Sequence, residues 1–331
     1  MIKKVAVFND LSGFGKCSLT AAIPVLSVLG VQCNPIPTMV LTGQGGFKVA
    51  SRKDLTEMLP DYTYAWRKNG ACFDGIYSGY LTCPKQIEYV MDFLKVFRKK
   101  HTFLLVDPVM GDNERTYNIY SKELLEGMKE LSRQANLITP NLTEACLLSD
   151  TPLEEVFYLF SKKELLEKVS QIAYKLRDAS VTRQDVIITG VKVQEDHDWF
   201  IYNVALTPNG ICFYASEWFN QSFSGTGDLF ASAMCGLRVN GYSTEEALPI
   251  AGDFLHHSIA DTFEPMITDI QTPTSASSTK HLRLETDNNS YQDNLKKTSS
   301  NNITSNNHYI NGNDGVAFEK HLKELIIYAK D

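Results

Sequence analysis

Residues 101–109, HTFLLVDPV, contain the clearest strand pattern of the chain, a run of apolar residues that ends at an aspartate and a proline. Similar apolar runs lie at residues 5–8, 73–79, 135–141 and 185–190, and helical patterns separate them. Strands that alternate with helices in this way are typical of βαβ units, whose parallel strands are buried on both faces. The sequence therefore predicts an α/β fold with a mostly parallel central sheet and helices on both faces.

Further segments extend this pattern along the chain. Residues 31–38 predict another strand, and residues 199–218 predict an antiparallel hairpin that turns around Thr207–Gly210. Helices are expected over residues 18–30, 53–69, 84–100, 161–179, 226–239 and 243–263. Because ligands bind beyond the carboxyl ends of parallel strands, polar residues that follow the strands are the first candidates for a site.

Residues 271–313 differ in composition from the rest of the chain. They are rich in Asn, Ser and Thr and contain few large apolar residues. Such a segment buries too little surface to offset its chain entropy, so it is expected to be disordered. Apolar residues with helical spacing return from Val316 onward. We therefore expect one folded domain over residues 1–270, an insert, and a closing helix over residues 314–331 that completes the domain.

Charge and cysteine content argue against several classes of protein. The 331 residues carry a formal net charge of −7, which argues against a nucleic-acid partner because phosphates require a basic surface. The seven cysteines include no CxxC pair, so zinc-site spacing is absent and reduced thiols of the cytosol are expected. The N-terminal residues predict a strand rather than a signal peptide, and no stretch approaches the roughly 20 apolar residues of a membrane span. A cytoplasmic protein without a membrane partner is expected.

The stretch SFSGTGDLFASAM at 222–234 contains the strongest chemical pattern. Gly225, Thr226 and Gly227 directly precede a predicted helix, where free backbone N–H groups form a site for an anion such as a phosphate. Asp228 in the first turn could accept the proton of an attacking hydroxyl group while these amides hold a phosphoryl group. The alternative is that Asp228 only stabilises the helix dipole.

Acidic and amide side chains also follow other predicted strands. VDPVMGD places Asp107 and Asp112 across a turn, where the carboxylates could hold magnesium or simply serve the turn. ITPNLTEA places Asn141 and Glu144 three residues apart at a helix start. That spacing suits either helix capping or contact with the phosphates and metal of a nucleotide.

Two common nucleotide-binding motifs do not fit the loop Gly13–Lys16. Asp10 and Cys17 break the pattern of a P-loop, and Ser18 stands where the third glycine of a dinucleotide-binding fingerprint belongs. Lys16 is therefore expected to be an exposed loop lysine.

Taken together, the motifs resemble those of one family. DLSGFG, TGQGG, YSGYL, VDPVMGD, ITPNLTEA, VIITG and FSGTGD follow one another as in the pyridoxal kinases of the ribokinase-like superfamily. The resemblance covers residues 1–265 and implies a ribokinase-like three-layer fold. It also implies ATP-dependent phosphorylation of the 5′-hydroxymethyl group of pyridoxal, pyridoxamine or pyridoxine, a step of vitamin B6 salvage. Since members of this family are usually dimers, a homodimer is expected.

The resemblance further implies roles for individual residues. The implied roles are catalytic base for Asp228, anion hole for Gly225, Thr226 and Gly227, ATP binding for Asn141, Glu144 and Thr189, substrate binding for Asn9, Asp10, Ser12, Gly45 and Tyr80, and metal binding for Asp107, Asp112, Thr139 and Glu144. Mg²⁺ bound with ATP is the implied cofactor, and a monovalent cation is a further candidate. An ordinary core tyrosine is the alternative for Tyr80.

The sequence departs from the patterns of related kinases at two places. Gly45 stands where many pyridoxal kinases carry threonine. The loop SGFGKCS is shorter than the matching loop of hydroxymethylpyrimidine kinases, which argues against that substrate. The alternatives are a kinase of the same fold that acts on hydroxymethylpyrimidine or a sugar, and a non-catalytic metabolite-binding protein. An intact Asp228 argues against the last alternative, because a protein that only binds its ligand needs no base.

Overall fold

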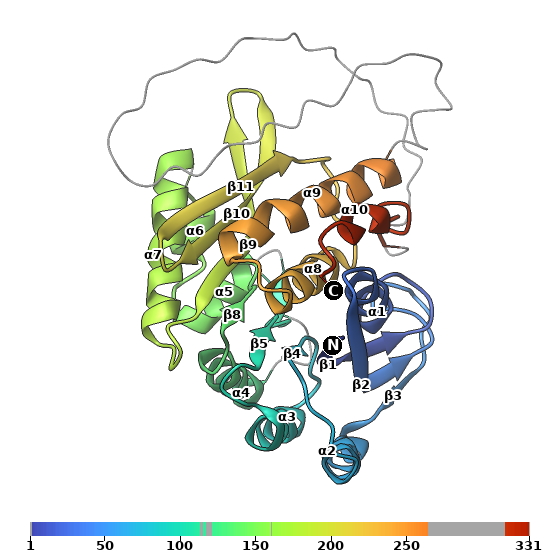
Figure 1. Cartoon of the computed structure of the whole chain (residues 1–331). Helices are drawn as coiled ribbons and strands as arrows, with labels where there is room; N and C mark the ends of the chain where they lie inside the picture. The colour runs from blue at the N-terminus through green and yellow to red at the C-terminus, as the bar shows by residue number, and fades with distance from the viewer. Residues whose placement is uncertain (1, 113–114, 117–120, 160, 264–314, 331) are drawn as a thin grey trace.

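A mixed sheet of nine strands forms the centre of the molecule (Figure 1), and the computed structural model describes residues 2–112, 115–116, 121–159, 161–263 and 315–330. From edge to edge the strands are β11 (Gly210–Glu217), β10 (Asp198–Thr207), β9 (Asp185–Glu195), β8 (Leu137–Ile138), β5 (Phe103–Val106), β4 (Gly75–Ser78), β1 (Lys3–Ser12), β2 (Val31–Leu41) and β3 (Arg52–Asp54). Neighbours from β9 to β2 run parallel, whereas β10, β11 and β3 are antiparallel additions. The predicted α/β class and mostly parallel sheet are confirmed. A short pair, β6 (Gly111–Asp112) and β7 (Arg115–Thr116), lies outside this sheet.

Helices cover both faces of the sheet and complete a three-layer fold (Figure 1). One face carries α1 (Ser18–Val28), α8 (Thr226–Val239), α9 (Thr244–Phe263) and α10 (Leu322–Ile326). The other carries α2 (Leu59–Lys68), α3 (Pro84–Phe97), α4 (Lys122–Arg133), α5 (Leu142–Ser149), α6 (Glu154–Phe157) and α7 (Lys162–Asp178). Successive side chains of a strand point to opposite faces. Val5 and Val7 of β1 therefore join the core beneath α1, α8, α9 and α10, while Ala6 and Phe8 join the core on the other face.

The helix predicted over residues 53–69 is wrong in its first part. Residues 52–54 form β3, which pairs with the end of β2 at the edge of the sheet. The Asp54 carboxylate then accepts the backbone N–H of Thr56 at 2.8 Å and starts a 3-10 turn, η1 (Thr56–Met58), before α2 begins. Pairing with a neighbouring strand therefore overrides the local helical pattern.

The closing helix predicted over residues 314–331 is also wrong in its extent. Within the described residues 315–330, only the five residues of α10 are helical. Gly315 instead forms a parallel bridge with Lys16, and the side chains of Val316 and Phe318 are buried against the sheet and α9. The apolar side chains that predicted a helix are therefore buried, although most of the segment is not helical.

Other expectations concern the chain as a whole. The expected disordered insert, residues 271–313, lies outside the described residues, so the structure does not test it. Among the described helices, none has both the length and the apolar character needed to cross a bilayer. All seven cysteines are free thiols.

Candidate active site

A cavity of about 1440 Å³ lies where the parallel strands end and α8 begins. Its volume exceeds that of an ordinary small-molecule pocket and leaves room for a nucleotide beside a second molecule. Of the residues predicted to form a site, those that line the cavity are Asp10, Ser12, Gly45, Tyr80, Asp107, Asp112, Thr139, Asn141, Glu144, Thr189, Gly225, Thr226, Gly227 and Asp228. The fold thus brings together motifs that lie more than 200 positions apart in the sequence, such as Asn9 and Asp228.

The loop before α8 has a backbone conformation that only glycine adopts readily. Gly225 caps the helix with φ of +83°, and a Cβ at this position would lie 2.0 Å from the carbonyl oxygen of Lys16. The close approach fixes the loop against the chain that leads into α1. The backbone N–H groups of the first turn of α8 are thereby presented to the cavity as an anion site.

Asp228 lies in the first turn of α8, partly buried beside this loop. Its Oδ1 accepts a hydrogen bond from Asn9 Nδ2 at 3.0 Å. Burial raises the pKa of Asp228 to about 6, against the opposing effect of the backbone N–H of Ser18 and the Asn9 amide. A carboxylate with a pKa of this size is ionised at neutral pH and can still accept a proton, as general-base catalysis requires.

Asn9 does not face the cavity, contrary to its predicted contact with substrate. Its side chain is fully buried, and Oδ1 accepts the backbone N–H groups of Asp10 at 3.0 Å and Tyr80 at 2.9 Å. With both ends of its amide engaged, Asn9 fixes the position of Asp228. The reason is that Asn9 lies within β1 rather than after it, and its side chain is enclosed between Asp228 and the backbone of Asp10 and Tyr80.

The predicted substrate residues Asp10, Ser12 and Tyr80 lie on the cavity wall. The Asp10 carboxylate accepts hydroxyl hydrogen bonds from Ser12 at 3.0 Å and from Ser18, and burial raises its pKa. Tyr80 is only partly buried and lines the cavity, so it is not an ordinary core tyrosine. A Cβ at Gly45 would meet no atom within 4 Å, which leaves open space at that wall.

Asp107 and Thr139 lie side by side at the ends of β5 and β8. Thr139 Oγ1 donates a hydrogen bond to Asp107 Oδ1 at 2.9 Å, and both side chains are buried. Asp107 Oδ2 approaches the start of α8 and lies 4.0 Å from the position of a Cβ on Gly227. Burial and the negative charge of Asp228 raise the pKa of Asp107, so this end of the cavity favours a bound cation. Asp112 lies on the exposed rim of the same region.

Asn141 and Glu144 form a helix-capping box at the start of α5. Asn141 Oδ1 accepts the Glu144 N–H at 3.0 Å, and Glu144 Oε2 accepts the Asn141 N–H at 2.8 Å. Glu144 Oε1 also accepts the Met110 N–H at 2.9 Å, while Asn141 Nδ2 donates to the Gly111 carbonyl at 2.7 Å. The capping interpretation is therefore confirmed. Both residues also hold the 110–111 turn beside the cavity.

A family comparison decides what kind of protein has this site. The family described as phosphomethylpyrimidine kinase matches residues 55–273, which include the cavity wall from Tyr80 to the middle of α9. The chain belongs to the phosphomethylpyrimidine kinase family. The membership confirms the predicted ribokinase-like fold and makes the protein an ATP-dependent kinase.

Several proteins described as kinases resemble this chain over most of their length. A crystal structure of a protein described as a phosphomethylpyrimidine kinase from Bacteroides thetaiotaomicron, in a form with pyridoxal, is 32% identical with a TM-score of 0.77, covering 98% of this chain and 96% of that chain. A pyridoxal kinase structure from Lactobacillus plantarum is 26% identical with a TM-score of 0.71, covering 80% and 91% of the two chains. A protein described as a pyridoxal kinase from Schizosaccharomyces pombe is 25% identical over 78% of this chain and 81% of its own.

The kinase cavity also contains residues that the sequence did not single out. Ser18 binds the Asp10 carboxylate, and Gln44 Nε2 donates to Ser224 Oγ at 3.3 Å, joining the TGQGG loop to the loop before α8. A wall of aromatic side chains, Trp199, Trp218 and Phe219, lines another part of the cavity. The only sequence signal for Trp199 and Trp218 was membership of the predicted hairpin, and Phe219 follows it directly. Lys16, which was expected to be an exposed loop lysine, has a side chain that is 36% exposed, and its Nζ forms an ion pair with Glu319 at 2.8 Å.

Proposed function

We propose that this kinase transfers the γ-phosphoryl group of ATP to the 5′-hydroxymethyl group of pyridoxal, pyridoxamine or pyridoxine. The observation that carries the proposal is the position of Asp228, held by Asn9 beside the Gly225–Gly227 loop on the cavity wall. The Bacteroides relative crystallised with pyridoxal and the pyridoxal kinases among the relatives support a B6 vitamer as substrate.

Asp228 acts as the general base in the proposed reaction. It takes the proton of the substrate hydroxyl group, the oxygen forms a bond to the γ-phosphorus, and the bond from that phosphorus to the β,γ-bridging oxygen breaks to release ADP. The backbone N–H groups of Gly225, Thr226 and Gly227 stabilise the negative charge on the transferring group, helped by the positive end of the α8 dipole.

The donor set at the end of β5 fits a hard divalent cation. Asp107, Asp112, Thr139 and Glu144 offer oxygen atoms only, which suits Mg²⁺. When bound with ATP, Mg²⁺ supplies charge neutralisation on the phosphates. Asp107 is the proposed direct ligand, and Glu144 acts through water because both of its oxygens already accept backbone N–H groups. A requirement for a monovalent cation is tested by replacing K⁺ with tetramethylammonium in the assay.

The remaining cavity residues divide between the two substrates. Asp10, Ser12 and Tyr80 contact the vitamin ring, with the space beside Gly45 accommodating its substituents. Asn141 and Thr189, which are joined by a backbone bridge, lie on the nucleotide side. A homodimer is also proposed, because members of the family are usually dimers. Light scattering of the purified protein, which measures its molar mass, tests this proposal.

A second candidate function is phosphorylation of hydroxymethylpyrimidine, which the family description itself favours. The deciding experiment offers Mg·ATP with pyridoxal, pyridoxamine, pyridoxine and hydroxymethylpyrimidine in parallel, for the wild type and Asp228→Asn. Turnover of a B6 vitamer that is lost in the variant supports the proposal. Turnover of hydroxymethylpyrimidine alone would make that compound, and not a B6 vitamer, the substrate. Nucleotide binding without turnover of any compound would favour a metabolite-binding protein.

A further inference from the structure

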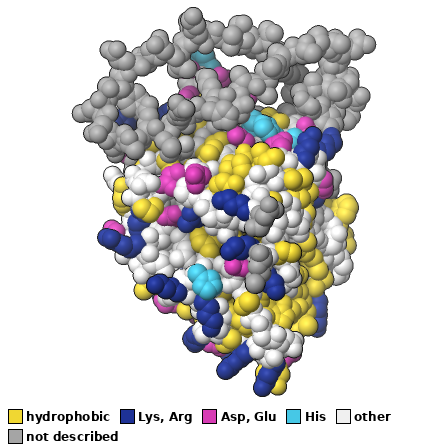
Figure 2. Space-filling model, in the orientation of Figure 1, with side chains coloured by type: hydrophobic (Ala, Val, Ile, Leu, Met, Phe, Trp, Pro, Cys, Tyr) yellow, Lys and Arg dark blue, Asp and Glu magenta, His cyan; other side chains and the backbone are white. Residues whose placement is uncertain are grey.

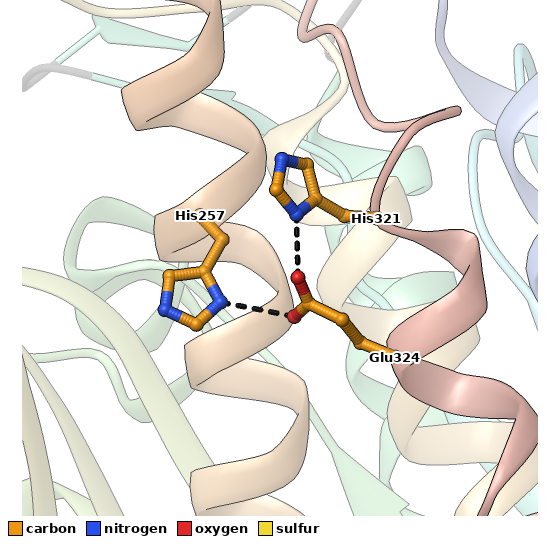
Figure 3. Close-up of side chains that lie close together, drawn as sticks. All are labelled: His257, His321 and Glu324. Carbon is orange, nitrogen blue, oxygen red and sulfur yellow. Dashed lines mark hydrogen bonds and ion pairs between the residues drawn. The ribbon is translucent and has the colours of Figure 1, made fainter.

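A second group of chemically reactive side chains lies where α9 meets the C-terminal segment, residues 315–330. Glu324 Oε2 lies 2.9 Å from His257 Nδ1, and Glu324 Oε1 lies 2.6 Å from His321 Nδ1. Figure 3 shows the two imidazole rings directed at the two oxygens of this one carboxylate. The candidate ligand atoms all lie within 4.8 Å of one another. None of the three residues lines the kinase cavity.

The donor set is of the kind that binds zinc rather than magnesium. Two imidazole nitrogens and one carboxylate oxygen make a His₂Glu set, to which Zn²⁺ adds water as a fourth ligand. Mg²⁺ and Ca²⁺ prefer oxygen ligands throughout. The site is also accessible, since the side chains of His257 and Glu324 are 39% and 32% exposed. In Figure 2, histidine and acidic side chains adjoin one another on the surface over α9 and α10.

The surroundings of His321 favour a bound cation. Its Nε2 lies 3.1 Å from Asp261 Oδ2, within ion-pair distance, and has no hydrogen-bond partner among the described residues. When Nε2 carries the proton, Nδ1 presents its lone pair to Glu324 Oε1. The lone pairs of Nδ1 and Oε1 repel each other unless a second proton or a metal ion is bound by both atoms. Metal-bound histidines commonly donate their other N–H group to a carboxylate. Lys320 Nζ, 3.6 Å from Asp261, is a nearby basic group.

We propose that His257, His321 and Glu324 bind one divalent ion of the Zn²⁺ class, with Asp261 orienting His321. The ion joins α9 to the segment that returns after residues 264–314. His257 and Glu324 are 67 positions apart in the sequence, and a metal that closes so long a loop restricts the unfolded chain strongly. Because the complete ligand set exists only in the folded chain, metal binding stabilises the fold. The ion takes no part in phosphoryl transfer.

Cobalt spectroscopy of the untagged full-length protein tests this site. Co²⁺ is added without nucleotide and with excess Mg²⁺, so that the cavity at Asp107 does not compete. We expect the visible d–d bands of a four-coordinate Co²⁺ site, saturating at one ion per chain and abolished by added Zn²⁺. His257→Ala and His321→Ala should remove the bands. Glu324→Gln, which keeps the size of the side chain, should also remove them. Asp261→Asn should weaken Co²⁺ binding about 10–100-fold.

A matched control separates this cluster from other histidines. His281 and His308 lie outside the described residues, and the double variant His281→Ala/His308→Ala should keep the bands. Thermal unfolding gives a second measurement: Zn²⁺ should raise the Tm of the wild type and of this control, but not that of Glu324→Gln. Kinase activity should survive in Glu324→Gln. Absence of bands in the wild type, their persistence in His257→Ala/His321→Ala, or their loss in the control would each overturn the proposal.

Discussion

At the scale of single residues, Asp228 is expected to control both the rate and its pH dependence. Asp228→Asn should lower kcat by about 10²–10⁴-fold, the range for loss of a general base, with nucleotide affinity little changed. In the wild type, kcat/KM should fall about tenfold per pH unit below about pH 6, because the base must be ionised and burial raises its pKa to about 6. Steady-state kinetics over a pH series measures both effects. A variant with wild-type kcat would remove Asp228 from the mechanism.

Asn9 is expected to act through Asp228. Its amide lowers the pKa of Asp228, so Asn9→Ala should move the acidic limb of the kcat/KM profile to higher pH and reduce kcat. The variant should also lose about 1–3 kcal/mol of unfolding free energy, because two buried backbone N–H groups lose their acceptor. Asn9→Asp keeps the acceptor and removes the donor, so the limb should move in the same direction. An unchanged limb in both variants would assign Asn9 to stability alone.

The different outcomes for Asp228 and Asn9 show what kind of residue can be predicted from sequence. Asp228 lies inside a contiguous pattern of glycines and a helix start, so local chemistry suffices to place it on the cavity. The partner of Asn9 is 219 positions away, and the direction of its side chain depends on how β1 sits between two cores. Local sequence contains neither fact.

At the scale of elements, the contact between α1 and α8 depends on a glycine. A Cβ at Gly236 would lie 2.5 Å from Leu29 Cδ1 and 3.4 Å from Leu29 Cβ. We expect Gly236→Ala to lower the unfolding free energy by about 1–2 kcal/mol, because overpacking outweighs the gain in helix propensity. The control is Gly127→Ala in α4, whose Cβ would lie 2.9 Å from the terminal Cδ1 of Ile87 and at least 3.6 Å from its other atoms, and which should change stability less. Chemical denaturation measures both, and equal stabilities would contradict the prediction.

Elements were predictable where one strand or helix forms by its own pattern. The apolar run at residues 101–109, in a chain where strands alternate with helices, was enough to predict the parallel sheet. The hairpin turn at Thr207–Gly210 occurs where it was predicted. The errors fall at β3 and at residues 315–321, where a partner elsewhere in the chain sets the conformation. The His257–His321–Glu324 cluster has the same origin, since its members meet only after the C-terminal segment packs on α9.

At the scale of the whole molecule, the described residues on either side of residues 264–314 lie close together. The Ala317 N–H donates to Thr262 Oγ1 at 2.8 Å, so a short linker can replace most of the intervening chain. Deletion of residues 273–312 should therefore leave kcat and Tm near those of the wild type. Loss of soluble protein on this deletion would show that the segment contributes to folding.

Truncation after Phe263 is the matching variant with the opposite expectation. It removes Val316, Phe318 and Leu325, whose side chains are buried in the core on the α8 face. Each lost contact of this kind costs on the order of 2–5 kcal/mol when a large side chain is removed. The truncated protein should therefore unfold at lower temperature or fail to accumulate, as thermal unfolding and expression yield will show.

The position of Lys16 connects the glycine loop before α8 to a segment that the ribosome makes much later. The Lys16 carbonyl occupies the space left by the absent Cβ of Gly225, and Gly315 forms a backbone bridge with the same residue. A ribosome makes Gly315 roughly 90 residues after Gly225, which at about 5–20 residues per second takes on the order of 5–20 s. During that interval the nascent chain already contains its proposed base and its glycine loop, but not the Gly315 bridge to Lys16 beside them. A translation product that stops before Gly315 is therefore expected to lack this support of the loop.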